Sequence, residues 1–115
     1  MAVELGVIEG YFGKPWSHGD RKHVMTRLRD IGYSWFHYAP KADAFLRRRW
    51  REPHPSAVLA ELVELSAYCR GLGMRFGMGL SPYELCRDFS GPGRADFIAK
   101  VRALDDTGID ELAIL

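Results

Sequence analysis

The chain has 115 residues, of which 47% are hydrophobic and 27% are charged, and its formal net charge at pH 7 is +1. This composition is typical of a soluble globular protein and argues against a disordered chain. A nearly neutral chain has no strong field to draw it onto nucleic acid, and no apolar run approaches the roughly 20 residues of a membrane span, so we expect neither partner.

Strand and helix patterns alternate along the chain. Apolar strand patterns cover residues 4–9, 33–38, 74–80 and 109–115, and helical patterns with one apolar face cover residues 22–31, 57–72 and 94–107. Each helical pattern stops before a glycine (Gly32, Gly73 or Gly108), which adopts the left-handed conformation that closes a helix without steric cost. Ser17 and Ser56 are the expected N-caps of the first two helices. Continuous apolar strands between helices predict a parallel sheet.

Two parallel-sheet folds fit this order. A doubly wound nucleotide-binding sheet needs a glycine-rich phosphate loop after its first strand, but here that loop holds Tyr11, Phe12 and Pro15, which obstruct close approach of the backbone to a phosphate. Four strands in 115 residues matches the number of residues per strand in a (β/α)₈ barrel, which has eight strands in about 250 residues. We therefore predict an α/β fold in which residues 1–115 are the first half of a TIM barrel, truncated within the fourth strand.

The termini and the metal-binding residue types add three expectations. Residues 1–5 show no basic segment followed by an apolar stretch, so no signal peptide is predicted and a cytoplasmic location is expected. His18 and His23 are five residues apart, which does not place them on one helical face. Cys69 and Cys86 form no C-x-x-C pair. We expect no metal, no cofactor and free thiols.

A barrel places its active site at the carboxyl ends of its strands. The connection after the second strand, residues 39–55, is far longer than most strand-to-helix loops, and such loops tend to be functional. It carries Lys41, Asp43, Trp50, Arg51 and Glu52. Aromatic and hydrogen-bonding side chains around a barrel mouth suit a sugar. The basic run 47–51 also resembles a nucleic-acid patch, but an acidic residue follows it at once and no second cluster supports it.

Four motifs, in order, resemble glycoside hydrolase family 84, the β-N-acetylglucosaminidases that include protein O-GlcNAcases and bacterial hyaluronidase-type enzymes. They are G-V-I-E-G-Y-F-G-K-P-W-S at 6–17, Y-A-P-K-A-D at 38–43, R-W-R-E-P at 49–53 and L-S-P at 80–82. The resemblance covers nearly the whole chain. It implies a hydrolase of terminal β-linked N-acetylglucosamine, with an N-acetylglucosamine-containing glycoconjugate as its ligand.

The resemblance also implies a mechanism. The 2-acetamido oxygen of the substrate attacks the anomeric carbon to form an oxazoline, in contrast to the scheme with two flanking carboxylates. Two adjacent aspartates at the end of the fourth strand orient the acetamido group and protonate the leaving oxygen. That pair is expected just after Leu115, so the resemblance implies no catalytic residue within the chain, and we expect the 115 residues alone to be inactive.

Two residues carry over from the family motifs as sugar contacts. Gly10 would offer its backbone carbonyl, and Lys41 its ammonium group, to hydroxyls of the N-acetylglucosamine ring. Asp43 is expected to fix its loop or pair with Lys41, and Glu9 to be a structural carboxylate at the barrel mouth. The adjacent pair at 105–106 lies in the last turn of the third helix, so we interpret it as a solvated helix end rather than a catalytic pair.

Two departures from the family pattern leave an alternative open. Tyr11 precedes Phe12, whereas the family usually has the reverse order, and Ala42 stands where the family usually has an aspartate. The alternative is a non-catalytic sugar-binding or interaction module derived from the same barrel; an unrelated α/β domain is the third reading.

If the chain is half a barrel, its expected partner is the missing C-terminal half of that barrel. We expect strands 4–9 and 109–115 to be unpaired edges, and an inner face built from residues such as Val7, Phe36, Phe76 and Ile114, or their immediate neighbours, to be uncovered.

Overall fold

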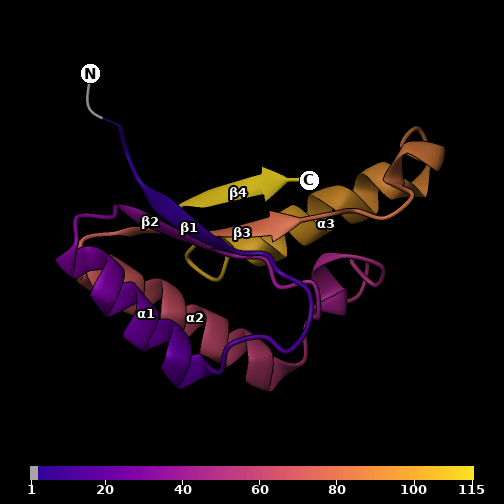
Figure 1. Ribbon diagram of the computed structural model, residues 1–115. Coiled ribbons are helices and arrows are strands. Elements are labelled where there is room, and N and C mark those ends of the chain that lie inside the picture. The colour runs from indigo at the N-terminus through magenta and orange to yellow at the C-terminus, as the bar shows by residue number, and fades with distance from the viewer. Residues whose placement is uncertain (1–2) are drawn as a thin grey trace.

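The computed structural model describes residues 3–115 as one parallel sheet with helices between its strands (Figure 1). The strands stand in the order β1-β2-β3-β4, and each pairs in parallel with the next. The elements are β1 (Gly6–Glu9), α1 (His18–Asp30), β2 (Trp35–Tyr38), η1 (Ala44–Leu46), α2 (Ser56–Gly71), β3 (Arg75–Leu80), η2 (Leu85–Arg87), α3 (Pro92–Asp105) and β4 (Glu111–Ile114). This confirms the predicted alternation of parallel strands and helices, and each strand is one to three residues shorter than predicted.

The helix ends follow the predicted residues with one exception. The Ser17 hydroxyl accepts from the Asp20 N–H at 3.1 Å and caps α1. Gly32, Gly73 and Gly108 have positive φ, as a left-handed helix end requires. The prediction that Ser56 caps α2 is wrong, because the Pro55 carbonyl already accepts the first helical hydrogen bond and Ser56 is the first helical residue. Within residues 3–115, no helix has the length and apolarity to cross a membrane.

One face of the sheet packs against the helices, and we call it the covered face. Figure 1 shows α1 and α2 side by side against it, and Leu104 of α3 joins the same buried core. Phe36 and Phe76 sit side by side on β2 and β3, with ring centroids 6.3 Å apart and planes nearly parallel. Both are fully buried. Burying large apolar side chains between sheet and helices is the main stabilising contribution of this layer.

The opposite face, which we call the open face, carries the alternate residues of each strand. The residues named for the inner face, Val7, Phe36, Phe76 and Ile114, therefore stand in rows of the covered face, and the barrel-facing positions are held by their immediate neighbours, which the prediction also allowed. In the register, Ile8, His37, Gly77 and Glu111 stand in one row across the four strands. Because side chains alternate along a strand, an assignment that is off by one residue moves the whole set to the other face.

The open face is partly polar. Arg75 binds Glu111 at 2.8 Å and Glu4 at 2.9 Å, and His37 Nε2 lies 3.8 Å from a Glu111 oxygen. Burial lowers the pKa of His37, against the opposing effect of Glu111. A Cβ added to Gly77 would lie 2.7 Å from the His37 ring, so glycine is needed there for the imidazole to lie across β3.

Candidate functional site at the carboxyl end of the sheet

The structure brings together the two residues predicted to contact sugar. Gly10 directly follows β1 and Lys41 follows β2, and these strands are paired so that Glu9 lies opposite Tyr38. A Cβ placed on Gly10 would lie 3.8 Å from Lys41 Nζ. The Gly10 N–H turns back to the Ile8 carbonyl at 2.9 Å, whereas its own carbonyl oxygen accepts no hydrogen bond within residues 3–115. A free carbonyl and an ammonium group thus stand side by side at this edge.

Lys41 is half-buried beside an exposed aromatic ring. Its Nζ lies 5.8 Å from the centre of the Phe12 ring, and Phe12 is 77% exposed. Across residues 3–115, no carboxylate forms an ion pair with Lys41, so its ammonium remains available to an incoming acceptor. The neighbouring Tyr11 instead packs edge-on against Trp16, with centroids 5.6 Å apart. Of the two adjacent aromatics, Phe12 is the one that offers its face beside Lys41.

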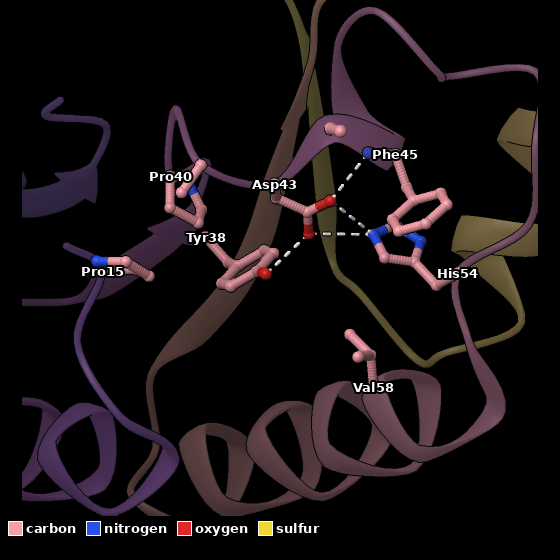
Figure 2. Close-up of a pocket in the computed structure, with 9 residues that line it drawn as sticks. Pro15, Tyr38, Pro40, Asp43, Phe45, His54 and Val58 are labelled. Carbon is pink, nitrogen blue, oxygen red and sulfur yellow. Dashed lines mark hydrogen bonds and ion pairs between the residues drawn. The ribbon is translucent and has the colours of Figure 1, made fainter. Parts of the chain in front are cut away.

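The loop that carries Lys41 is fixed by Asp43, as Figure 2 shows. The Asp43 carboxylate accepts hydrogen bonds from Tyr38 Oη at 2.6 Å, His54 Nε2 at 2.9 Å and the Phe45 N–H at 3.0 Å. Burial by itself would raise the pKa of Asp43, but these hydrogen bonds hold it below its usual value. The expectation that Asp43 fixes the loop is confirmed, and its partners are Tyr38 and His54 rather than Lys41.

A cavity of about 250 Å³ lies beside this network. Pro15, Pro40 and Val58 contribute apolar walls, and Tyr38, Asp43 and His54 contribute the polar atoms (Figure 2). Burial and the Asp43 charge raise the pKa of Tyr38, so its hydroxyl stays protonated and serves as a donor. The Asp43 oxygens are already occupied by internal donors. This arrangement holds the loop in place.

Glu9 is a structural carboxylate, as expected. It is fully buried and accepts two hydrogen bonds from Arg21 on α1, at 2.6 and 2.9 Å, and a third from the Trp16 N–H at 3.2 Å. A two-point arginine–carboxylate pair of this kind fixes both partners in orientation. Here it ties the end of β1 to α1 and so sets the direction in which the chain continues into Gly10.

Three residues of the long loop are engaged by contacts within the fold. Trp50 is 1% exposed, and its indole N–H donates to the Tyr83 carbonyl at 3.0 Å. Arg51 pairs with Asp88 at 2.9 Å and with an acid of α3, and Glu52 pairs with Arg49 at 2.7 Å. The burial of Trp50 is at odds with a place in a sugar-binding mouth, and the ion pairs of Arg51 and Glu52 join the loop to the next connection and to itself.

The adjacent aspartates at 105–106 fall where the sequence predicted. Asp105 ends α3 and Asp106 follows it, both exposed, at the edge of the sheet where β4 begins rather than where it ends. The described residues include no group of three or more histidine, cysteine, aspartate or glutamate side chains that could hold a metal ion. Sequence analysis missed Arg21, Tyr38 and His54, because each partners a carboxylate that lies several residues away and no spacing rule links them.

Comparison with known proteins identifies the family of the chain. A family model described as beta-N-acetylglucosaminidase (NAGidase) matches residues 5–115. Protein O-GlcNAcase from Rattus norvegicus and its counterpart from Mus musculus are each 34% identical over 77 residues, which is 67% of this chain and 8% of theirs. The solved structure of CpGH84B is 32% identical with a TM-score of 0.86, and the match covers 96% of this chain and 20% of that one. The chain spans a small part of these relatives, and it belongs to the β-N-acetylglucosaminidase family, glycoside hydrolase family 84.

Proposed function

We propose that residues 1–115 form the first four strands of a (β/α)₈ barrel that hydrolyses terminal β-linked N-acetylglucosamine from glycoconjugates. The observation that carries this proposal is the placement of Lys41 Nζ beside Gly10 at the carboxyl edge of the sheet, in a chain matched by the family over residues 5–115. Both groups have free hydrogen-bonding capacity that a sugar hydroxyl can use, since a hydroxyl both donates and accepts.

In this proposal the chain binds the sugar and the rest of the barrel does the proton chemistry. Lys41 would donate to one ring hydroxyl, and the Gly10 carbonyl would accept from another. The acetamido oxygen of the substrate would attack the anomeric carbon, and two aspartates that follow the fourth strand would orient the acetamido group and protonate the leaving oxygen. Asp43, Tyr38 and His54 would hold the Lys41 loop without touching substrate.

The test compares the 115-residue chain with a complete barrel that contains it. We expect the chain alone to match buffer in an aryl N-acetylglucosaminide assay, because loss of a general acid alone forfeits about 10²- to 10⁴-fold in rate and the acetamido-orienting carboxylate would be missing too. We expect the complete barrel to hydrolyse the aryl N-acetylglucosaminide.

Two outcomes would contradict the proposal. A complete barrel that binds N-acetylglucosamine without turnover would favour the non-catalytic module. Activity of the repurified 115-residue chain that disappears in the double variant Asp105→Asn/Asp106→Asn would place the chemistry at the end of α3 instead.

A further inference from the structure

The basic run after η1 divides into two kinds of arginine. Arg49 makes a two-point pair with Glu52 at 2.7 and 2.8 Å, and Arg51 pairs with Asp88 at 2.9 Å. Arg47 and Arg48, by contrast, form no ion pair with any aspartate or glutamate side chain of residues 3–115. Two of the arginines are therefore occupied by the fold, and two carry uncompensated charge.

The two unpaired arginines line one cavity. It measures about 280 Å³ and lies where β3 and β4 end, between the Lys41 loop and the connection after β3. Arg48 lies over the Tyr83 ring, with Cζ 4.9 Å from the ring centre. The cavity is bounded by Arg47, Arg48, Ser81, Pro82, Tyr83 and Leu115. It is separate from the cavity beside Asp43, with which it shares no lining residue.

Arg47 connects this cavity to the proposed sugar contacts. Its Nη1 donates to the Lys41 carbonyl at 3.2 Å, and its Cζ lies 5.9 Å from the centre of the Phe12 ring, the same ring that Lys41 Nζ approaches. A ligand that places a sugar ring against Lys41 would therefore have its next group within reach of the arginines.

Three acids near this edge in the chain are already paired, and one of them, Glu84, binds Arg87 at 3.3 Å. Glu9 is fully buried and paired with Arg21, and Asp43 directs its carboxylate to Tyr38 and His54 on the other side of its loop. Within residues 3–115 the edge thus presents two guanidinium groups and one ammonium group without a free carboxylate side chain. These three cationic groups outnumber the two aspartates proposed to follow the fourth strand, so the edge keeps a net positive charge, which attracts anions and raises their local concentration.

We propose that Arg47 and Arg48 form a subsite for an anionic group (carboxylate, sulfate or phosphate) attached to the leaving-group side of the substrate. This inference rests on the proposed function, since it takes Lys41 and Gly10 as the contacts of the N-acetylglucosamine ring. The planar guanidinium matches the oxygen geometry of all three anions, which is why arginine is common at such sites. The neighbouring Ser81 offers a hydroxyl that can donate to the same group.

The test uses two matched substrates on the complete barrel. One is 4-nitrophenyl β-N-acetylglucosaminide, and the other carries a carboxylate on the same aryl ring. We expect Arg47→Gln and Arg48→Gln each to lower the ratio of kcat/KM for the charged over the neutral substrate by roughly five- to tenfold, as loss of one charged hydrogen bond at a half-exposed site predicts. Arg49→Gln is the control, because Arg49 belongs to the same run but is already paired with Glu52.

Salt and free anion supply independent readouts. Raising the ionic strength from about 0.05 M to about 0.5 M should reduce the preference for the charged substrate, since exposed charges are screened. Free sulfate that removes the preference at constant ionic strength would show that the subsite also takes an unattached anion. An unchanged ratio in both arginine variants, or an equal loss in Arg49→Gln, would overturn the proposal.

Failure of the anion subsite and failure of the proposed hydrolase give different results. If the complete barrel hydrolyses the neutral substrate but shows no arginine-dependent preference, the subsite is wrong and the hydrolase stands. If neither substrate is hydrolysed, the hydrolase fails, and titration calorimetry of the two glycosides against the protein and its Arg48→Gln variant still decides the subsite. Equal affinities for the two glycosides would then contradict it.

Discussion

The two faces of the sheet differ in how well the rest of residues 3–115 covers them. The covered face has a closed layer in which Phe36, Phe76 and Met78 are fully buried against three helices. The open face leaves Ile8 53% exposed, although it stands mid-strand in the row of His37 and Gly77. An apolar side chain in the middle of a strand normally has something packed against it.

This difference indicates what the missing contacts should be. A parallel sheet is normally covered on both faces, by helices on both sides or by the opposite wall of a closed barrel. The match to 20% of the CpGH84B chain, with a TM-score of 0.86, favours the second arrangement. The polar set of Arg75, Glu111 and His37 then belongs to the barrel interior, and the strand edges β1 and β4 would meet further strands.

The largest effect expected from this comparison is on stability. Phe36→Ala in the complete barrel should lower the free energy of unfolding by about 3–5 kcal/mol, because it empties a fully packed site. Ile8→Ala should also cost about 2–5 kcal/mol there, because the opposite wall of the barrel would cover the open face. Urea titrations of the complete barrel followed by far-UV circular dichroism measure both. A loss below about 0.5 kcal/mol for Ile8→Ala would show that the open face stays uncovered.

The next effect concerns the network beneath the Lys41 loop. Asp43→Asn should cost about 2–3 kcal/mol, since it removes the charge that accepts from Tyr38 and His54. The pKa of Asp43 is held below its usual value, so its contribution is fully present above about pH 4 and is lost as the pH falls through the pKa of the folded state. In the complete barrel, the difference in melting temperature between the wild type and the variant should therefore stay constant from neutral pH down to about pH 4 and shrink at lower pH. Parallel curves would show that this carboxylate is not the titrating group.

A smaller effect is expected at the exposed edge, where function rather than stability should respond. Lys41→Ala in the complete barrel should leave the melting temperature nearly unchanged and reduce kcat/KM for an N-acetylglucosaminide by about 10- to 150-fold, the equivalent of roughly 1.5–3 kcal/mol. Steady-state kinetics checks this, with Lys14→Ala as a control for an exposed lysine of the preceding loop. Unaltered kinetics would make Lys41 an ordinary loop residue.

Sequence reasoning predicted the order of elements and the glycine helix ends because these depend on local rules. Alternation of apolar runs with amphipathic segments predicts a parallel sheet wherever the covering helices lie. It did not predict which face each residue takes, and Phe36 and Phe76 were assigned to the inner face. Residues 35–38 carry aromatic rings at every position and give no alternation from which the side can be read. Around Phe76 the large residues at 74, 76, 78 and 80 alternate with arginine and glycine, a signal that could have placed Phe76 on the covered face.

Part of the candidate site could also be predicted from the sequence, namely the part that lies in short motifs. Gly10 and Lys41 lie in motifs shared with a family, so their proximity could be expected from sequence. The absence of ion pairs at Arg47 and Arg48 among residues 3–115 could not be predicted from the sequence, because it depends on which of several nearby acids each arginine reaches in the fold. Trp50 illustrates the opposite error: an aromatic between arginines indicates a ligand platform in sequence, yet the folded chain buries it.

The central claim is that the open face and the strand edges are built to meet the rest of a barrel. Sedimentation velocity of the purified 115-residue chain, with a thermal melt of the same sample, tests it most directly. Uncovered apolar side chains forgo about 1.5–3 kcal/mol each, and unpaired strand edges invite pairing with other chains. We predict dimers, larger aggregates or a molten state, and a stable monomeric fold only when the remaining strands are supplied. A monodisperse monomer with a sharp cooperative melt would show that the 115 residues are a self-sufficient domain and would contradict the account.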